Sequence, residues 1–234
     1  VRRRPVPVRV HGSNGSKKWQ RPVSPADKDL IDRVLETPVP GWYPQDEVFW
    51  GDLHRSGYHQ GIDRFHQFYT RRNLIALTSL WSRIDAQPAE LREALRLWVL
   101  SFNASHSTLM TRVVLKQGQK DFVSTGAQSG VLYISGLPVE KNVFEGVRRK
   151  IRTFSQAFEM TYDSHSTVEV VNASSTQLDL ADESVSYVLT DPPFGAFIPY
   201  AELNQINEAW LGHTTDRTNE AIVSPAQGKA VAEY

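Results

Sequence analysis

Four consecutive residues, Asp191-Pro192-Pro193-Phe194, bring together a carboxylate, two rigid residues without a backbone N–H group, and an aromatic ring. They follow the apolar run 185–190, which predicts a buried strand that ends at Asp191. At average composition, with Pro near 5%, roughly one chain of this length in a few hundred would contain such a tetrapeptide by chance. These residue types suit one chemistry well, the methylation of an amino group whose lone pair is conjugated to a ring.

The exocyclic amine of adenine or cytosine is a weak nucleophile because its lone pair is delocalised. We expect the Asp191 carboxylate to accept one N–H of such an amine and the Pro192 carbonyl to accept the other, which stabilises the positive charge that develops on nitrogen. Pro192 and Pro193 hold this carbonyl in place because proline fixes φ at about −65°. Phe194 offers a face for a base taken out of its stack. The alternative interpretation is an ordinary turn after a strand, where proline is common.

Composition narrows the class of protein. The chain has 234 residues, of which 40% are hydrophobic, so it can bury a sizeable core. Its formal net charge is zero, so no global basic field indicates nucleic acid. It has no Cys, which excludes disulfides and thiolate zinc sites and suits the cytoplasm. No apolar stretch approaches the roughly 18 residues of a membrane span. Because Val1 is not an initiator methionine, we expect a fragment of a longer chain.

The distribution of Pro, Gly and apolar residues divides the chain into three regions. Residues 1–60 are punctuated by Pro and Gly and are predicted to be irregular, apart from a short helix with Ser24 as its N-cap. Residues 61–160 are predicted to be mainly helical with a short strand at 131–134, and they are the candidate DNA-facing part. Residues 161–234 contain the Asp191 loop and are predicted to belong to an α/β domain.

Apolar spacing predicts helices over 70–85, 89–102, 143–158 and 201–211. The residues expected to face the core are Leu74, Leu77, Trp81 and Ile84 in the first helix, Leu91, Leu95, Trp98 and Phe102 in the second, Val147, Ile151, Phe154 and Phe158 in the third, and Leu203, Ile206 and Trp210 in the fourth.

Two sets of polar residues on these helices have alternative interpretations. Arg148, Arg149, Lys150 and Arg152 form the densest basic face of the chain, which is either a phosphate contact or an ordinary solvated helix face. Glu202 and Asn204 follow the Asp191 loop closely, so they either reach the site or have capping and surface roles.

Two further segments, 167–171 and 185–190, are predicted to be strands, and the polar residues 172–175 follow the first of them. A strand, a polar loop, a second strand and a catalytic loop follow the order of an α/β sheet, in which ligands bind at the carboxyl ends of the strands.

The motif Thr190–Gly195, followed by Ile198–Asn204, resembles the site-specific DNA methyltransferases that act on adenine. It is most similar to large bacterial and archaeal DNA methylases whose Asp-Pro-Pro-Phe loop leads into an Ile-x-Tyr-x-Glu-Leu-Asn helix. Segments 68–74, 132–134, 139–143 and 215–216 also fit this picture, so the resemblance extends from about residue 60 to the end. The Asp-Pro-Pro-Phe block is its sharply diagnostic part.

The resemblance implies an incomplete Rossmann-like sheet with a helical insertion, S-adenosylmethionine as cofactor and DNA as partner. Asp191, Pro192, Pro193 and Phe194 would form the catalytic loop, and Asn172, Ser174 and Thr190 would lie near the cofactor. The chain departs from the family in one respect, since it lacks the separate glycine-rich cofactor loop. We therefore expect it to be the central, catalytic-loop part of a longer enzyme of restriction–modification or phage defence.

Three functions remain open. The first is methyl transfer to N6 of adenine in DNA. The second is the same chemistry on cytosine N4, an RNA base or a protein glutamine. The third is a non-catalytic nucleic-acid-binding module that retains the loop. No metal is expected, because His54, His59 and His66 lack a tight ligand spacing.

Overall fold

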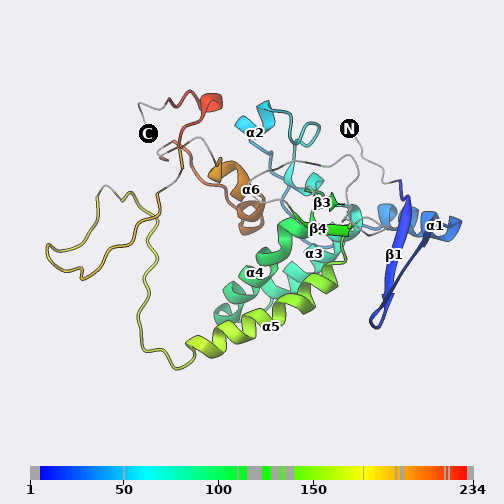
Figure 1. Ribbon diagram of the computed structural model, residues 1–234, viewed down its shortest axis with the longest axis horizontal. Coiled ribbons are helices and arrows are strands. Elements are labelled where there is room, and N and C mark those ends of the chain that lie inside the picture. Colours follow the sequence, from blue (N-terminus) through cyan, green and yellow to red (C-terminus); the bar gives the residue numbers. More distant parts are fainter. Residues whose placement is uncertain are drawn as a thin grey trace.

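The computed structural model describes residues 6–49, 51–109, 111–114, 123–127, 132, 134, 140–175, 177–192, 194–195, 198–218, 220 and 222–230. Its elements, in chain order, are β1 Arg9–Asn14, β2 Lys17–Pro22, α1 Pro25–Glu36, α2 Asp52–Arg55, η1 Phe65–Phe68, α3 Arg71–Asp85, α4 Ala89–Asn103, η2 Ala104–His106, β3 Thr111–Val114, β4 Val123–Ala127, α5 Val143–Thr161, α6 Tyr200–Leu211 and η3 Pro225–Gln227 (Figure 1).

Helices α3, α4, α5 and α6 confirm the four helices predicted from the apolar spacing, with ends shifted by up to three residues. The hydroxyl of Thr70 accepts a hydrogen bond from the N–H of Asn73 and so caps α3. Gly212 ends α6 in the left-handed conformation that glycine adopts most readily. Local sequence signals thus determine where these helices begin and end.

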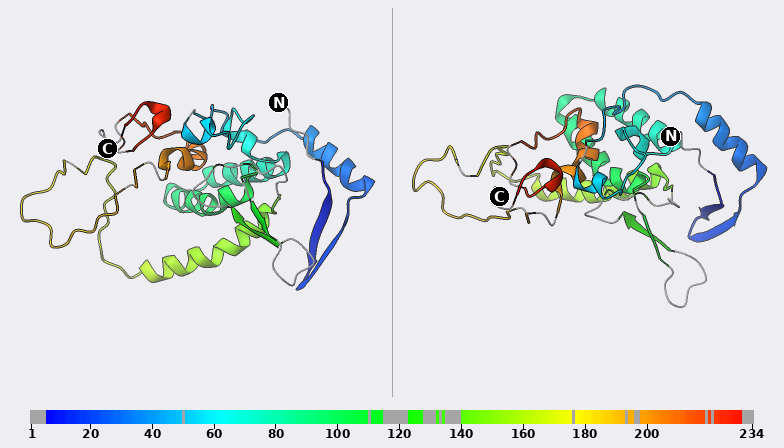
Figure 2. Two further views of the ribbon diagram at one scale, coloured as in Figure 1. Left: turned by 45° about the horizontal axis from the view of Figure 1, so that its top comes forward. Right: turned by 90° about the horizontal axis from the view of Figure 1, so that it is seen from above.

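Helices α3, α4 and α5 form the core of the molecule, where they lie side by side (Figures 1 and 2). All four core residues predicted in α3 are buried. A glycine at 146 lets α5 approach the end of α4, since a Cβ there would lie 2.6 Å from Cε1 of His106. The predicted inward faces of α4 and α5 are wrong at Leu91, Ile151 and Phe158, which are exposed because the described helices cover only part of each apolar stripe.

The N-terminal region is more regular than predicted. Strands β1 and β2 form an antiparallel hairpin whose register pairs Asn14 with Lys17 and leaves Gly15 and Ser16 as its two-residue loop. Gly15 has φ +59°, which a side chain would disfavour. The predicted short helix is α1, where the carboxylate of Asp27 accepts hydrogen bonds from the backbone and hydroxyl of Ser24.

The described strands form two antiparallel pairs, β1 with β2 and β3 with β4. Of the predicted strand 131–134, Ile134 forms an isolated bridge to Leu109, whereas residues 131 and 133 lie outside the described part. The predicted strands 167–171 and 185–190 are not formed. Both segments are exposed, and within the described part of the chain neither pairs with another segment. The Rossmann-like sheet therefore stays a prediction.

Residues 163–190 leave the helical core and return to it as a long exposed loop (Figures 1 and 2). The accessible surface of the chain is 17011 Å². A compact protein of 26.5 kDa would expose roughly 10,700 Å². The chain thus exposes more surface than a compact protein of its size, and its exposed residues include many large hydrophobic side chains. Among the described residues, the helices include none with both the length and the apolar character of a membrane span.

Candidate active site

The Asp191 loop lies at the surface, between the long exposed loop and α6. Asp191 and Pro192 are exposed, and the ring of Phe194 is 61% exposed, whereas Pro193 lies outside the described residues. Gly195 has φ +57°, and a Cβ built on it would lie 3.8 Å from Cγ2 of Val223. The end of the loop therefore approaches the C-terminal segment, and its aromatic ring is free to meet a ligand.

Helix α6 follows the loop and is fixed to the helical core by buried hydrogen bonds. The indole N–H of Trp210 donates to the hydroxyl of Tyr69 over 2.9 Å, and that hydroxyl donates to Oδ1 of Asn103 over 2.6 Å. Burial raises the pKa of Tyr69 beyond its ordinary range, so the hydroxyl keeps the proton that it donates. These contacts give the C-terminal side of the loop a rigid support.

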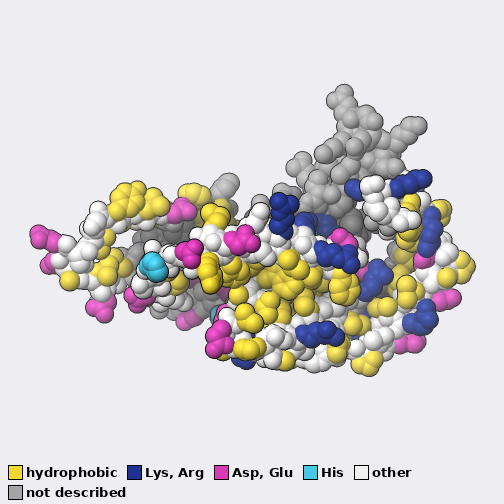
Figure 3. Space-filling model, turned by 90° about the horizontal axis from the view of Figure 1, so that it is seen from below, with side chains coloured by type: hydrophobic (Ala, Val, Ile, Leu, Met, Phe, Trp, Pro, Cys, Tyr) yellow, Lys and Arg dark blue, Asp and Glu magenta, His cyan; other side chains and the backbone are white. Residues whose placement is uncertain are grey.

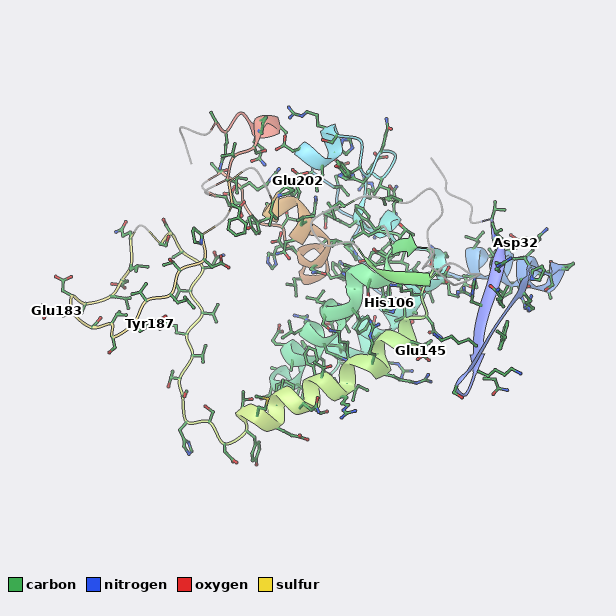
Figure 4. The ribbon with its side chains drawn as sticks, viewed as in Figure 1. Asp32, His106, Glu145, Glu183, Tyr187 and Glu202 are labelled. Atoms are coloured by element: carbon green, nitrogen blue, oxygen red, sulfur yellow. The ribbon has the colours of Figure 1, made fainter. Side chains whose placement is uncertain are left out.

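Glu202 links the first turn of α6 to α2, about 150 residues earlier in the chain. Its side chain is buried, and its two oxygens accept hydrogen bonds from the N–H groups of Asp52 at 2.6 Å and Leu53 at 2.8 Å (Figure 4). Burial raises the pKa of Glu202, and the two backbone hydrogen bonds oppose this rise. Of the two alternatives for Glu202, the structure supports capping.

The C-terminal segment is attached to the same helix end. The carboxylate of Asp52 accepts hydrogen bonds from the hydroxyl of Ser224 at 2.7 Å and from the N–H of Ala226 at 3.0 Å. Glu202 and Asp52 therefore hold α6, α2 and the residues around Ser224 in one arrangement. This arrangement places the segment that meets Gly195 at a defined position next to the loop.

A surface cavity of about 370 Å³ lies between α6 and the segment that follows it. Its volume is at the lower end of the range for small-molecule sites. Apolar, aromatic and polar groups mix in its lining, which consists of Tyr200, Ala201, Leu203, Asn204, Glu208, Thr215 and Glu220. Asn204 lines this cavity, but no residue of the Asp191 loop does, so whether Asn204 reaches the Asp191 site stays a prediction.

Two carboxylates give the cavity its electrostatic character. Glu208 is buried and accepts hydrogen bonds from the amide of Asn204 at 2.8 Å and from the N–H and hydroxyl of Thr215. Burial raises the pKa of Glu220, and the nearby Glu208 raises it further. Oε2 of Glu220 is buried and has no hydrogen-bond partner among the described residues. Two of the residues that line the cavity are therefore carboxylates, whose oxygens are hydrogen-bond acceptors.

The predicted cofactor-binding residues lie on the long exposed loop. Asn172, Ser174 and Thr190 are exposed on the extended backbone of residues 163–190, the region where Figure 4 labels Glu183 and Tyr187 far from α6. Their exposure alone does not test whether these three residues bind S-adenosylmethionine, which stays a prediction. No step of cofactor binding can therefore be derived from their geometry.

Sequence reasoning assigned no role in a site to Glu208, Thr215 or Glu220, although segment 215–216 belongs to the family resemblance. The spacing of Asn204 and Glu208, four residues apart on one helix face, is the signal that could have identified the first. Thr215 and Glu220 come from an irregular segment in which no periodicity marks a role. The described residues contain no group of three or more His, Asp or Glu side chains that could hold a metal ion.

Comparisons with known protein families, with curated proteins and with solved structures gave no match. The resemblance to DNA adenine methyltransferases therefore rests on the sequence motifs alone, of which the block around Asp191 is the most diagnostic.

Proposed function

We propose that this chain is the catalytic-loop part of an S-adenosylmethionine-dependent methyltransferase that modifies N6 of adenine in DNA. The observation that carries the proposal is the exposure of the Asp191 side chain. The carboxylate of Asp191 is exposed and makes no hydrogen bond or ion pair with another described residue. An exposed carboxylate without a partner among the described residues, close to an exposed aromatic ring, suits a group that binds a substrate.

The residues of the loop have distinct roles in this proposal. The Asp191 carboxylate accepts a hydrogen bond from one N–H of the target amine, and the Pro192 carbonyl accepts one from the other. As the nitrogen gains its methyl group it becomes positively charged, and both acceptors stabilise that charge. Phe194 stacks on the base, which has left the duplex to reach the loop.

The methyl group comes from S-adenosylmethionine in this proposal, and the described residues do not supply its pocket. The proposal therefore includes the Rossmann-like sheet, in which 167–171 and 185–190 would pair as neighbouring strands. Their exposed valines and leucines support this, because such side chains stabilise a protein by about 1.5–3 kcal/mol each when they become buried. A sheet would also bring Asn172, Ser174 and Thr190 to one edge.

The cavity beside α6 supports an amine-bearing substrate. Its volume of about 370 Å³ is large enough for a nucleobase, and its acceptor groups on Glu208 and Glu220 complement N–H donors. The tyrosine at position 200 adds an aromatic side chain to the lining.

The test is methyl transfer from labelled S-adenosylmethionine to unmodified DNA, with RNA and protein offered in parallel. The protein is expressed from its complete reading frame, as wild type and as the variants Asp191→Asn and Asp179→Asn. Asp179 is the matched control because it is an exposed carboxylate in the same loop region. We expect labelled N6-methyladenine from wild type and the control, and a loss of at least about 100-fold in Asp191→Asn.

Each other outcome is informative. Label in RNA or in protein glutamine would keep the role of Asp191 but change the substrate. Full activity in Asp191→Asn would refute the assigned role. Absence of transfer from a protein that binds DNA would identify a recognition module that retains the loop.

A further inference from the structure

The N-terminal region that contains the β1–β2 hairpin concentrates positive charge. Residues 1–22 include seven Lys and Arg side chains and no Asp or Glu. Because the whole chain has 26 Lys and Arg and 26 Asp and Glu, residues 23–234 carry a formal net charge of −7. Solvated protein surfaces usually mix charges of both signs, so a stretch of this length with one sign only indicates an anionic partner.

Negative charge gathers at the other end of the molecule. Residues 163–190 contain five carboxylates and no Lys or Arg. In Figure 3, Lys and Arg side chains lie on the half of the molecule that carries the hairpin, whereas the end formed by the long exposed loop shows Asp and Glu side chains. The two signs of charge are thus separated along the molecule, and a polyanion meets an attractive field at the hairpin end.

One face of the hairpin is engaged in contacts within the chain. Cross-strand partners lie on the same face of a β-ribbon, and the register pairs Gly12 with Trp19. The ring of Trp19 covers Gly12, since a Cβ at Gly12 would overlap this ring. Arg21, two residues after Trp19 and therefore on the same face, forms an ion pair with Asp27 of α1 at 2.6 Å. The charge of Arg21 is thus compensated.

The other face and the tip of the hairpin are open to solvent. His11 and Gln20 pair in the register and are exposed on this face, together with Arg9 and Lys18. Arg9 donates a hydrogen bond to Oε1 of Gln20 at 3.1 Å, which aligns its guanidinium group along the ribbon. Lys17 and Lys18 follow the turn, are exposed, and form no ion pair with another described residue. The open face therefore ends in two uncompensated cations.

We propose that the β1–β2 hairpin binds duplex DNA by entering the major groove, with Lys17 and Lys18 at the phosphates and the open face toward the bases. The major groove of B-DNA is about 12 Å wide and admits a two-stranded β-ribbon. The hairpin lies at the edge of the molecule beside α1, where a duplex can approach it (Figures 1 and 2). This inference goes beyond the proposed function, because the hairpin lies outside residues 61–160 and its binding requires no methyl transfer.

Three other anionic partners fit the hairpin less well. The major groove of duplex RNA is deep and narrow and does not admit side chains of a ribbon. Single-stranded nucleic acids stack on aromatic rings, whereas the ring of Trp19 packs over Gly12 and lies 6.0 Å from the guanidinium carbon of Arg21. A lipid surface requires large apolar side chains on the face that meets it, and Arg9, His11, Lys18 and Gln20 are polar.

The test measures binding of the full chain to a short labelled DNA duplex by fluorescence anisotropy over a range of salt concentrations, without S-adenosylmethionine. Lys17→Gln with Lys18→Gln removes two charges from the tip. Arg149→Gln with Arg152→Gln removes the same charge from exposed positions of α5, the other candidate phosphate contact, and is the matched control. Lys17→Arg with Lys18→Arg keeps the charge of the tip. Circular dichroism establishes that each variant keeps its secondary structure.

We expect Lys17→Gln with Lys18→Gln to weaken DNA binding at least about tenfold near 0.1 M salt. The slope of log K against log salt concentration should become shallower by about 2, since each lost phosphate contact removes about one released counterion. The α5 control and the Arg pair should bind nearly as tightly as wild type.

The proposal would be overturned if wild type did not bind the duplex, if the two lysines had no effect, or if the α5 control lost as much affinity. Equally effective competition by duplex RNA, single-stranded DNA, polyglutamate or vesicles of anionic phospholipid would overturn it as well. None of these results would decide the role of Asp191, which the methyl-transfer assay with Asp191→Asn measures separately.

Discussion

The N-terminus of α2 depends on a carboxylate from the far end of the chain, and this can be tested quantitatively. In Glu202→Ala, the N–H groups of Asp52 and Leu53 lose their acceptor, and that of Leu53 is buried. An orphaned buried donor costs about 1–3 kcal/mol. We therefore expect Glu202→Ala to lower the free energy of unfolding by about 1–3 kcal/mol, measured by urea denaturation with circular dichroism and tryptophan fluorescence at pH 7.

The matching change on the other side of this contact is Gly51→Ala. A Cβ at Gly51 would overlap the carboxyl group of Glu202. The backbone of Gly51 is extended, so the clash alone makes the substitution unfavourable, by about 1–3 kcal/mol. In the Glu202→Ala background the obstructing carboxyl group is gone, and the second change should cost at least about 1 kcal/mol less.

The contribution of Glu202 to the free energy of unfolding should decrease as the pH rises. Because burial raises the pKa of Glu202 in the folded state, the folded protein binds more protons than the unfolded chain just above the ordinary pKa of a glutamate. The contribution of this group to stability is fully present below that pKa and declines as the pH rises through the folded value. Glu202→Gln removes the titration, so the difference in stability between wild type and variant should change over this window.

The control for both experiments is Glu159→Ala, which removes an exposed carboxylate from α5 and should alter stability by less than about 0.5 kcal/mol. The capping contact would be refuted if Glu202→Ala were as stable as the control. It would also be refuted if the effects of Glu202→Ala and Gly51→Ala were additive.

Three further predictions concern the core. Gly146→Ala should lower the free energy of unfolding by about 1–3 kcal/mol in urea, although Ala favours helices, because its Cβ would press on His106. Tyr69→Phe should cost about 1–3 kcal/mol in the same assay, since it leaves Trp210 without an acceptor in the core. Burial lowers the pKa of His59 to about 4 from 6.5, so stability should fall by up to about 3 kcal/mol as the pH drops between these values, and His59→Phe should flatten that profile.

The helices could be predicted from sequence because their signals are local. Thr70 caps α3, Gly212 ends α6, and apolar residues recur at helical spacing between such ends. The hairpin formed by β1 and β2 had an equally local signal, the Gly15-Ser16 pair between its strands, which the abundance of proline in this region obscured.

Which side of a helix is buried could be predicted less well. The apolar stripe of α5 indicated one buried face, yet Ile151 and Phe158 are exposed. A stripe identifies the side that favours burial, but its burial depends on a neighbour that the helix itself does not encode. The same reasoning applies to Glu202, whose role depends on α2, a short helix about 150 residues away in the chain.

Residues 163–190 show most clearly that local sequence does not encode the partner on which a structure depends. A strand has no hydrogen bonds of its own, because every ladder bond requires a partner. The alternation in 167–171 and 185–190 therefore predicts a preference, and the preference is realised only where another strand is available. Within the described part of the chain no such strand pairs with them, and their side chains remain exposed.

The absence of a pairing partner for 185–190 among the described residues affects the proposed chemistry directly. Misplacement of a catalytic group by 1 Å can cost about 100-fold in rate, so the carboxylate of Asp191 must be held from both sides. The hydrogen bonds of Glu202 and Trp210 fix α6 and thereby the C-terminal side of the loop. The N-terminal side continues into the exposed segment 185–190, which has no comparable support among the described residues. Pairing of this segment in a sheet would supply the missing constraint, so the proposed sheet and the proposed activity of Asp191 depend on each other.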